Sequence, residues 1–393
     1  MKTATTKPAY DVDALRRTEF PWALRRVIYL NSASVGPYPE RTRRALEAFN
    51  ARRCQPDQLP DEELSEIEGR TRRLCARLIG AESAEIALGF NTSFGLNLAA
   101  TALGLKPGDR IVLLDGDFPA NVYPWLNLER RGLDVEFIRR DARGLPNEEG
   151  ALERLERGDV RLFATSAVGF CTGYRLNVGA ISRACRSHGT YLVIDGIQAL
   201  GVLPLDVRQV PVDILACGGQ KWLLGPWGTG FAYIRRGLID ELDPVAVGWL
   251  GFKPSLDFHS LLSYELDPLD GARRFELGTL GSGGFDALNN SLSLLLELGI
   301  CDIFTHVRAV QKPLVDWIGA RSDVEWVSDP ALERRSGIIA FRTADPAELC
   351  KRLQEAGIKV ALREGAVRVS THAYNTAEEI EQLMSVAEKV LEG

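Results

Sequence analysis

Short apolar runs alternate with helix-like patterns from Glu85 to Arg235, and this alternation constrains the fold more than any other feature of the chain. Seven runs have the length and composition of strands, at 85–90, 110–116, 134–139, 161–168, 190–196, 213–219 and 229–235. Helices are predicted between the earlier runs, at 93–103, from Asn121, at 147–157 and at 177–189. Because nearly continuous apolar strands separated by helices are typical of a sheet covered on both faces, the sequence predicts an α/β fold with a mostly parallel seven-stranded sheet.

A second region follows an irregular Pro- and Gly-rich stretch at 243–284. Its predicted elements are helices at 286–299 and 302–319, a strand at 337–343, a helix at 346–356, strands at 359–364 and 366–372, and a final helix from Thr376. This order predicts a small α+β domain. We therefore expect an N-terminal arm at 1–28 that packs with the small domain or a partner subunit, a large domain at 29–265 and a small C-terminal domain at 266–393.

Composition excludes several classes of function. The chain has 393 residues, is 45% hydrophobic and 25% charged, and has a formal net charge of -6, which argues against nucleic acid or an anionic membrane as the main partner. Its first thirty residues are charged throughout, and no stretch approaches about 20 apolar residues, so a soluble cytoplasmic protein is expected. Seven scattered cysteines without CxxC spacing and four dispersed histidines predict no metal site.

Residues suited to catalysis or ligand binding follow the predicted strands. In parallel sheets, ligands bind at this carboxyl edge. Asp195 ends an apolar strand, and Lys221 lies in the apolar segment CGGQKWLLGPWGTGF. Desolvation lowers the pKa of a lysine and makes its amine nucleophilic, which suits Schiff-base chemistry. A turn-capping aspartate and a surface lysine are the alternative interpretations of these two residues.

Two further strand ends complete a pattern. Thr92 and Ser93 lie where a strand meets a helix, and Phe118 follows the strand at 110–116. Taken alone, a helix cap and a core aromatic explain them. Together, an anion cradle, an acid, a flat ring and an apolar lysine match what pyridoxal phosphate (PLP) requires: Phe118 would stack on the cofactor ring and Lys221 would form the imine.

With these motifs, the chain resembles the class V aminotransferases of PLP-dependent fold type I, a group that includes cysteine desulfurases, isopenicillin N epimerase-like proteins and kynureninases. The resemblance extends from YLNSASVGP (29–37) to VRVSTHAYNT (367–376) and includes DGIQ (195–198) and QKW (220–222). It implies that Lys221 is the Schiff-base lysine, that Asp195 partners the pyridine nitrogen and that Gln198 bonds the phenolic oxygen. It places Thr92, Ser93 and Gln220 at the phosphate.

The resemblance also implies a homodimer with shared active sites. In RRFELGTLGSGG (273–284), Thr279 would reach the phosphate of the neighbouring subunit, and Trp249 would approach it across the dimer. Arg368 occupies the position of the arginine that binds the substrate carboxylate, with Arg363 as a weaker candidate, and Asn31 is assigned to the substrate site.

Departures from the family pattern bear on the reaction. Cysteine desulfurases carry a mobile cysteine just before the substrate arginine, and ALREGAVR (361–368) has none. Phe118 replaces their ring-stacking histidine. By elimination we predict an aminotransferase that acts on an amino acid through an external aldimine. A β-lyase or an epimerase is the alternative, and a non-catalytic PLP-binding regulator is a remote one.

Overall fold

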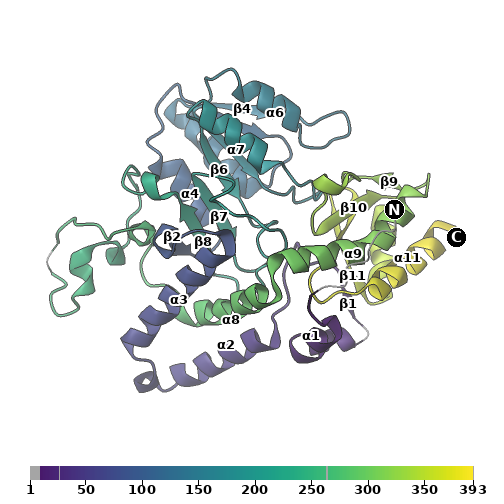
Figure 1. Ribbon diagram of the computed structural model, residues 1–393, viewed down its shortest axis with the longest axis horizontal. Helices are drawn as coiled ribbons and strands as arrows, with labels where there is room; N and C mark the ends of the chain where they lie inside the picture. Colours follow the sequence, from purple (N-terminus) through teal and green to yellow (C-terminus); the bar gives the residue numbers. More distant parts are fainter. Residues whose placement is uncertain (1–8, 26, 263, 393) are drawn as a thin grey trace.

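A seven-stranded sheet forms the centre of the computed structural model, which describes residues 9–25, 27–262 and 264–392 (Figure 1). Its strand order is β2 (Ile86–Gly89), β8 (Gly230–Ile234), β7 (Ile214–Gly218), β6 (Tyr191–Asp195), β5 (Leu162–Ser166), β3 (Arg110–Leu114) and β4 (Asp134–Ile138). Only β8 is antiparallel to its neighbours, and the remaining pairs are parallel. The predicted fold class is therefore confirmed, strand by strand.

Both faces of this sheet are covered, as its continuous apolar strands require. In β6, Leu192 and Ile194 belong to one hydrophobic cluster, whereas Val193 belongs to another on the opposite face. The first cluster includes α7 (Val178–Ser187) and α6 (Glu148–Leu155), and the second includes α4 (Thr92–Ala102). Alternate side chains of a strand point to opposite faces, so the central strand β6 is buried on both of its sides.

The prediction of a helix that starts near Asn121 is wrong, because the segment does not form one continuous helix. The segment is divided into η4 (Pro119–Asn121), the one-turn helix α5 (Tyr123–Leu126) and η5 (Asn127–Arg131). Pro119 and Pro124 lie at the start of the first two pieces, where a proline is tolerated because its missing N–H has no helical partner. A proline cannot donate within a continuous helix, which explains the division.

The C-terminal region forms a second sheet of order β12 (Ala361–Arg363), β13 (Ala366–Ser370), β10 (Ile338–Arg342) and β9 (Glu325–Trp326). All its pairs are antiparallel. The strand expected at 359–364 is instead two strands, because β11 (Ile358–Lys359) leaves this sheet and pairs in parallel with β1 (Ile28–Tyr29). The helices of this region are α9 (Ile300–Gly319), α10 (Pro346–Glu355) and α11 (Ala377–Glu392).

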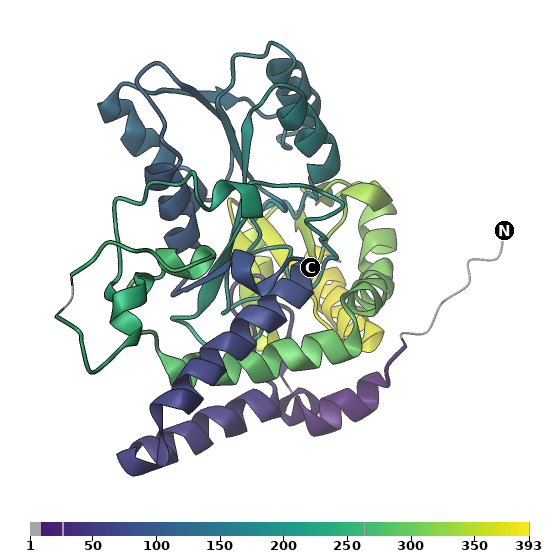
Figure 2. The same ribbon diagram turned by 60° about the vertical axis from the view of Figure 1, so that its left-hand side comes forward.

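Two long helices that the sequence analysis did not predict pack against the helix that leads into the C-terminal region. α2 (Glu40–Arg53) and α3 (Asp61–Ile79) pack along α8 (Ser282–Leu298), which leads into α9 (Figures 1 and 2). The short helix α1 (Val12–Thr18) contacts the C-terminal region, where Arg16 pairs with Glu379 at 2.8 Å and donates to the Tyr374 carbonyl at 2.8 Å. We propose on this basis that residues 9–25 of the N-terminal arm belong with the small domain; residues 1–8 of the expected arm lie outside the described residues.

A loop-rich segment at 243–270 extends away from the sheet (Figure 1, left; Figure 2). It carries short 3-10 turns, including η7 (Trp249–Gly251), and it exposes apolar side chains to an unusual degree. Leu262 is 80% exposed, and Tyr264 and Leu266 are each 84% exposed. Side chains of this kind usually become buried against a partner surface.

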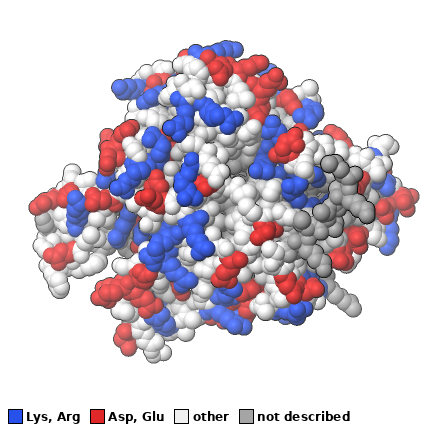
Figure 3. All heavy atoms as spheres, viewed as in Figure 1, with Lys and Arg blue, Asp and Glu red and all other residues white. Residues whose placement is uncertain are grey.

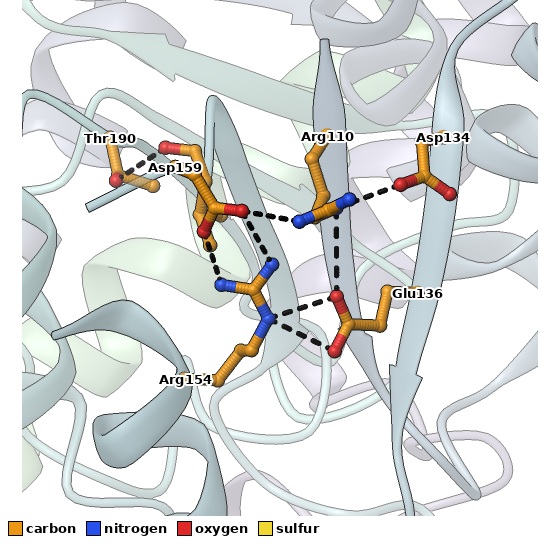
Figure 4. A network of polar contacts seen from close by, with 7 residues as sticks. Arg110, Asp134, Glu136, Arg154, Asp159 and Thr190 are labelled. Carbon is orange, nitrogen blue, oxygen red and sulfur yellow. Dashed lines mark hydrogen bonds and ion pairs between the residues drawn. The ribbon is translucent and has the colours of Figure 1, made fainter. Parts of the chain in front are cut away.

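An arginine network stabilises the amino ends of the parallel strands (Figure 4). Arg154 of α6 donates to both carboxylate oxygens of Glu136 at 2.9 and 3.0 Å and to Asp159, and Arg110 links Asp159 to Asp134. These contacts tie β3, β4 and α6 together at the opposite end of the sheet from Asp195. In the described ranges, no helix is long and apolar enough to cross a lipid bilayer.

Candidate active site

Asp195 is the last residue of β6 and is almost completely buried at the centre of the sheet's carboxyl edge. One carboxylate oxygen accepts a 2.9 Å hydrogen bond from the Ile197 N–H, and no side chain among the described residues donates to the other. Burial raises the pKa of Asp195 to about 7, the Ile197 hydrogen bond opposes the rise, and the nearby Asp117 charge adds to it. A cationic partner would lower this pKa and stabilise the carboxylate.

Lys221 lies in a tight turn that follows β7. The Leu224 N–H closes the turn on the Lys221 carbonyl at 3.0 Å, and Leu224, fully buried, has φ of +57°, a costly conformation for a residue with a side chain. Gly36 packs so closely that a Cβ there would lie 2.0 Å from the Lys221 oxygen. The turn is therefore held in one strained position, as is common at functional sites.

The Lys221 amine is largely buried and lies 5.5 Å from the centroid of the Phe118 ring. Burial lowers the pKa of Lys221 to about 8; the Asp195 carboxylate opposes this shift, and the Arg368 cation adds to it. A substantial fraction of the amine is consequently neutral near pH 8. A neutral amine is the form that acts as a nucleophile or a base.

A cradle for an anion forms where β2 meets α4. The Asn91 side chain caps the helix by accepting from the Phe94 N–H at 3.0 Å, and Thr92 accepts from the Gly218 N–H at 2.9 Å. A Cβ on Gly218 would lie 2.5 Å from the Gln220 side-chain oxygen and 3.3 Å from the Thr92 hydroxyl. Thr92 and Gln220 thus converge over a glycine, beside the free N–H groups of a helix N-terminus, which attract anions.

Ser93, the second helical residue, is partly exposed and lines a shallow cavity with residues of the 244–277 segment. It lies one residue beyond Thr92, but within the described chain its hydroxyl forms no hydrogen bond with Gln220 or Lys221. Its assignment to the phosphate remains a proposal.

Phe118 follows β3 and is 39% exposed, with an edge-on contact to Phe170 at 5.2 Å between centroids. Its backbone N–H donates to the Asp117 carboxylate at 2.7 Å. Asp117 also accepts from the Ser166 N–H at 2.8 Å, from the Ser166 hydroxyl at 2.5 Å and from the Asn121 amide at 2.9 Å. Asp117 therefore fixes the position of the Phe118 ring relative to β5.

Gln198 is buried, and both the nitrogen and the oxygen of its side-chain amide form hydrogen bonds within the protein. The amide nitrogen donates to the Ala33 carbonyl at 3.1 Å, and the amide oxygen accepts from the Trp222 indole at 2.8 Å. One N–H of the amide remains for another acceptor. The proposed bond to a phenolic oxygen is consistent with this single donor.

Arg368 and Asn31 meet through Ser34. Arg368 is 2% exposed on β13 and donates to the Ser34 hydroxyl at 2.7 Å and to the Phe170 carbonyl at 2.7 Å, while Ser34 donates to the Asn31 oxygen at 2.8 Å. The Arg368 Nε is buried without a partner among the described residues. Burial, together with the nearby charge of Arg363, lowers the pKa of Arg368 to about 10. A buried guanidinium with an unused donor is suited to an anionic group such as a carboxylate.

In the described part of the chain, no hydrogen bond, ion pair or ring contact joins Trp249 or Thr279 to the site residues above. The Trp249 ring packs against Phe258 at 6.0 Å and is 45% exposed, and Thr279 is exposed. Both lie on or beside the segment that extends from the sheet. Their predicted contact with a phosphate requires the second subunit.

The sequence interpretation missed three residues at this site. Asp117 was not assigned a role, although it directly precedes Phe118, which was. Ser34 and Cys171 reach Arg368 and Arg363 from distant parts of the chain: the Cys171 sulfur lies 3.7 Å from the Arg363 carbonyl oxygen. Ser34 lies within the YLNSASVGP motif, but the sequence does not show that it meets Arg368, because this proximity depends on how the chain folds.

These residues fit PLP. Asp195 would hold the pyridine nitrogen, Phe118 would cover the ring, and Lys221 would supply the amine. Thr92, Gly218 and Gln220 would hold the phosphate at the start of α4. The absence of a side chain at Gly218 leaves the cradle open, one oxygen of Asp195 accepts no hydrogen bond from the described residues, and the Arg368 Nε is buried without a partner among them.

Comparisons with known proteins agree with this fit. The chain is 31% identical to a probable cysteine desulfurase of Methanothermobacter thermautotrophicus, over 93% of this chain and 95% of that protein. It is 30% identical to the isopenicillin N epimerase of Streptomyces clavuligerus, over 91% and 93% of the two chains. The apo structure of a cysteine desulfurase from Thermococcus onnurineus shares the fold at 23% identity, with a TM-score of 0.87 over 99% of this chain and all of the other.

The family described as Aminotransferase class-V matches residues 28–383, which include every site residue discussed above. A match over most of the chain, together with relatives of 30% identity or more that align along nearly its full length, establishes membership. The protein is a PLP-dependent enzyme of the class V aminotransferase family.

Proposed function

We propose that the protein is an aminotransferase, which moves the amino group of an α-amino acid to a 2-oxo acid. The observation that carries the proposal is the placement of the Lys221 amine 5.5 Å from the ring of Phe118, a side chain with no titratable group. One base acting alone, with an apolar ring in place of a second acid, suits movement of a proton on a single face of the substrate.

Each side chain has a role in this proposal. Bound PLP supplies an electron sink for the negative charge that develops at the substrate α-carbon. Lys221 accepts the proton from that carbon, and its pKa of about 8 keeps enough neutral amine for the task. Arg368, oriented by Ser34 and the Phe170 carbonyl, binds the substrate carboxylate. Asp195 balances the positive charge of the ring nitrogen.

The geometry gives less support to the reactions of the named relatives. Epimerisation normally needs a proton donor on each face of the α-carbon, and Phe118 cannot donate one. Persulfide chemistry needs a mobile cysteine before the substrate arginine. Here that segment is a tight hairpin, in which only Glu364 and Gly365 separate β12 from β13, both with positive φ, and it contains no cysteine.

β-Elimination is a second candidate, supported by Cys171. This residue lies beside Arg363. Burial raises the pKa of its thiol, and the nearby charge of Arg368 opposes this rise. A thiol that stays protonated is able to protonate a leaving group at the substrate β-carbon. A structure with the same fold, at 22% identity and a TM-score of 0.85, is of a cystine C–S lyase.

The proposal includes a homodimer. Trp249 lies on the segment at 243–270 that exposes leucines, Thr279 follows this segment in the chain and is exposed, and the site would be complete only when a second copy brings these residues to it. The free, scattered cysteines support a cytoplasmic location.

The test is to incubate the PLP-loaded enzyme with single amino acids and a 2-oxo acid, and to identify products by mass spectrometry. New pairs of amino acid and 2-oxo acid, formed in equal amounts, are expected. Formation of pyruvate and ammonia from cysteine or cystine without an amino acceptor would assign β-elimination instead. In that case Cys171→Ser should slow the reaction, whereas it should leave amino-group transfer within about twofold of its original rate.

A further inference from the structure

His372 is a completely buried histidine outside the group of residues assigned to the cofactor and the substrate. Charged side chains of both signs are mixed on the surface of the molecule, as the face in Figure 3 shows, whereas the His372 ring has no contact with solvent. The residue follows the end of β13 by two positions and Arg368 by four. Because a buried polar ring is costly without hydrogen bonds, the partners of its two nitrogens indicate its role.

The two ring nitrogens of His372 have partners of opposite kinds. The Ala373 N–H donates to Nδ1 at 2.7 Å, so this nitrogen carries no proton. Nε2 lies 3.0 Å from the Trp222 carbonyl oxygen, which can only accept, so the proton of the neutral ring is on Nε2. Burial lowers the pKa of His372 to about 4, and the bond to Trp222 opposes this shift. Near neutral pH the ring is therefore an uncharged donor to Trp222.

Trp222, the residue after Lys221, is held at its carbonyl and at its ring. Its indole N–H donates to the Gln198 side-chain oxygen at 2.8 Å, and its ring stacks on that of His372 with 5.7 Å between centroids. Two glycines leave room for it. A Cβ on Gly201 would lie 2.3 Å from the Trp222 carbonyl oxygen, and a Cβ on residue 337, also a glycine, would lie 2.5 Å from the edge of the indole.

Three successive carbonyl groups around Lys221 each accept a hydrogen bond. The carbonyl before Lys221 accepts from the Gly36 N–H at 2.9 Å, and that of Lys221 accepts from the Leu224 N–H at 3.0 Å. The third carbonyl, of Trp222, has His372 as its donor, and no main-chain N–H of the described residues donates to it. His372 is therefore the side chain that completes the fixation of this strained turn.

We propose that His372 is a positioning residue, which holds the Trp222 carbonyl and thereby fixes both the turn that carries the Lys221 amine and the indole that orients Gln198. The inference rests on the roles of Lys221 and Gln198 in the proposed function. His372 belongs to the C-terminal region, so the segment that carries Arg368 also holds the lysine turn of the large sheet.

Two substitutions separate this role from a general contribution to stability. His372→Gln can place an amide N–H where Nε2 lies, but it loses the acceptor for Ala373. His372→Asn can place an oxygen where Nδ1 lies, but it loses the donor to Trp222. Both lose the ring stack, so their melting temperatures should fall by similar amounts.

Steady-state kinetics of the PLP-loaded variants should differ in kcat. His372→Gln should stay within about threefold of the wild type, whereas His372→Asn should lose about tenfold or more, because a small displacement of the lysine amine slows proton transfer. KM for the amino acid should stay within about threefold in both, since Arg368 keeps its own bonds to Ser34 and Phe170. Equal kcat values in the two variants would overturn the proposal.

His306→Gln is the matched control. His306 is also buried, and its Nε2 lies 2.8 Å from a main-chain carbonyl oxygen, but that carbonyl belongs to Asn375 and not to the lysine turn. This variant should keep kcat within about twofold of the wild type. A loss as large as that of His372→Asn would overturn the proposal, because any buried histidine of the C-terminal region would then have the same effect.

A second measurement needs no substitution at His372. With isotope-labelled histidine, the magnetic resonance spectrum should contain exchange-protected ring N–H signals from His372 and His306, and His306→Gln identifies the second by its loss. Addition of PLP to the PLP-free protein should shift the His372 signal, because the Lys221 turn contacts the cofactor. An unchanged signal would overturn the proposal. If Lys221→Ala retains the absorbance of the lysine-bound cofactor, the role of Lys221 in the proposed function fails instead.

Discussion

The Lys221 amine and the Phe118 ring lie 5.5 Å apart, although they follow β7 and β3, which are separated in the sheet by β6 and β5. Both side chains reach over the carboxyl edge, above the strand that ends in Asp195. This convergence brings an amine, a ring and an acid to one point. The local sequence does not reveal this proximity, because 103 positions separate Phe118 from Lys221 in the chain.

Replacing Lys221 by alanine should abolish the visible absorbance of the lysine-bound cofactor and reduce turnover by about 10²-fold or more, since the base is lost. Lys253→Ala is the control, because Lys253 is an exposed lysine paired with Asp267. Absorbance and product formation are measured on the same preparations. If Lys221→Ala retains turnover, Lys221 is not the base.

The stability of the PLP-free enzyme should fall as pH rises from about 4 to 7. Burial raises the pKa of Asp195 to about 7 in the folded state, from 3.8, so the folded state holds this proton more tightly than the unfolded state does. Above pH 7 the folded state must carry a buried charge, and the free energy of unfolding should be lower by up to about 4 kcal/mol.

Urea denaturation at pH 5 and pH 8 measures this difference. Other groups also titrate in this interval, so the informative quantity is the comparison with Asp195→Asn. The asparagine variant lacks the titrating carboxyl and should show a smaller fall. Equal falls in the two proteins would mean that Asp195 does not titrate in this range.

Replacing Arg368 by glutamine should raise KM for amino acids about 10- to 100-fold and leave PLP retention nearly unchanged, because the lost contact is with the substrate carboxylate. Arg363→Gln is the matched control: Arg363 contacts the same Ser34 hydroxyl at 3.3 Å but is exposed, so its loss should matter less. Steady-state kinetics and cofactor content are compared. An unchanged KM in Arg368→Gln would remove this residue from the substrate site.

Replacing Asp117 by asparagine should lower the free energy of unfolding by about 3 kcal/mol. Four donors, from Phe118, Asn121 and two groups of Ser166, bond to this carboxylate, and an amide has only one oxygen to accept them. Asp115→Asn, at a half-exposed residue two positions earlier, should cost less than about 0.5 kcal/mol. Urea denaturation measures the free energy of unfolding of both variants. Equal losses in Asp117→Asn and Asp115→Asn would contradict the role of Asp117.

Much of the fold was predictable, because the seven apolar runs correspond to the seven strands with ends that agree within one or two residues. α2 and α3 were missed. α2 has only Thr42 and Phe49 buried among its fourteen residues, so its sequence carries a weak helical hydrophobic pattern, and it is stabilised by packing along α8. The division of 359–364 into β11 and β12 depends on pairing with β1, more than 300 residues away, which no local pattern reports.

The site residues likewise include some whose position could be predicted from the sequence and some whose position could not. Asp195 ends a strand, and Lys221 and Thr92 lie three residues beyond strand ends, so their position at one edge of the sheet could be inferred from strand order alone. Ser34 could not, because it meets Arg368 only through the bridge that joins Asn31 to Ser370. The internal use of the Gln198 amide by Ala33 and Trp222 was likewise not visible in the DGIQ motif.

The exposed segment at 243–270 should hold two copies of the chain together. Changing both Leu262 and Leu266 to aspartate should weaken dimerisation by about 100-fold or more, because two leucines that become buried at an interface each contribute about 1.5–3 kcal/mol. Turnover should fall with the dimer, since Thr279 and Trp249 would no longer reach the other site. Leu332→Asp, at an exposed leucine outside this segment, should leave dimer and turnover unchanged. Sedimentation velocity at several protein concentrations measures the mass, and a wild-type protein that sediments as a 43.3 kDa monomer throughout would refute the shared active site.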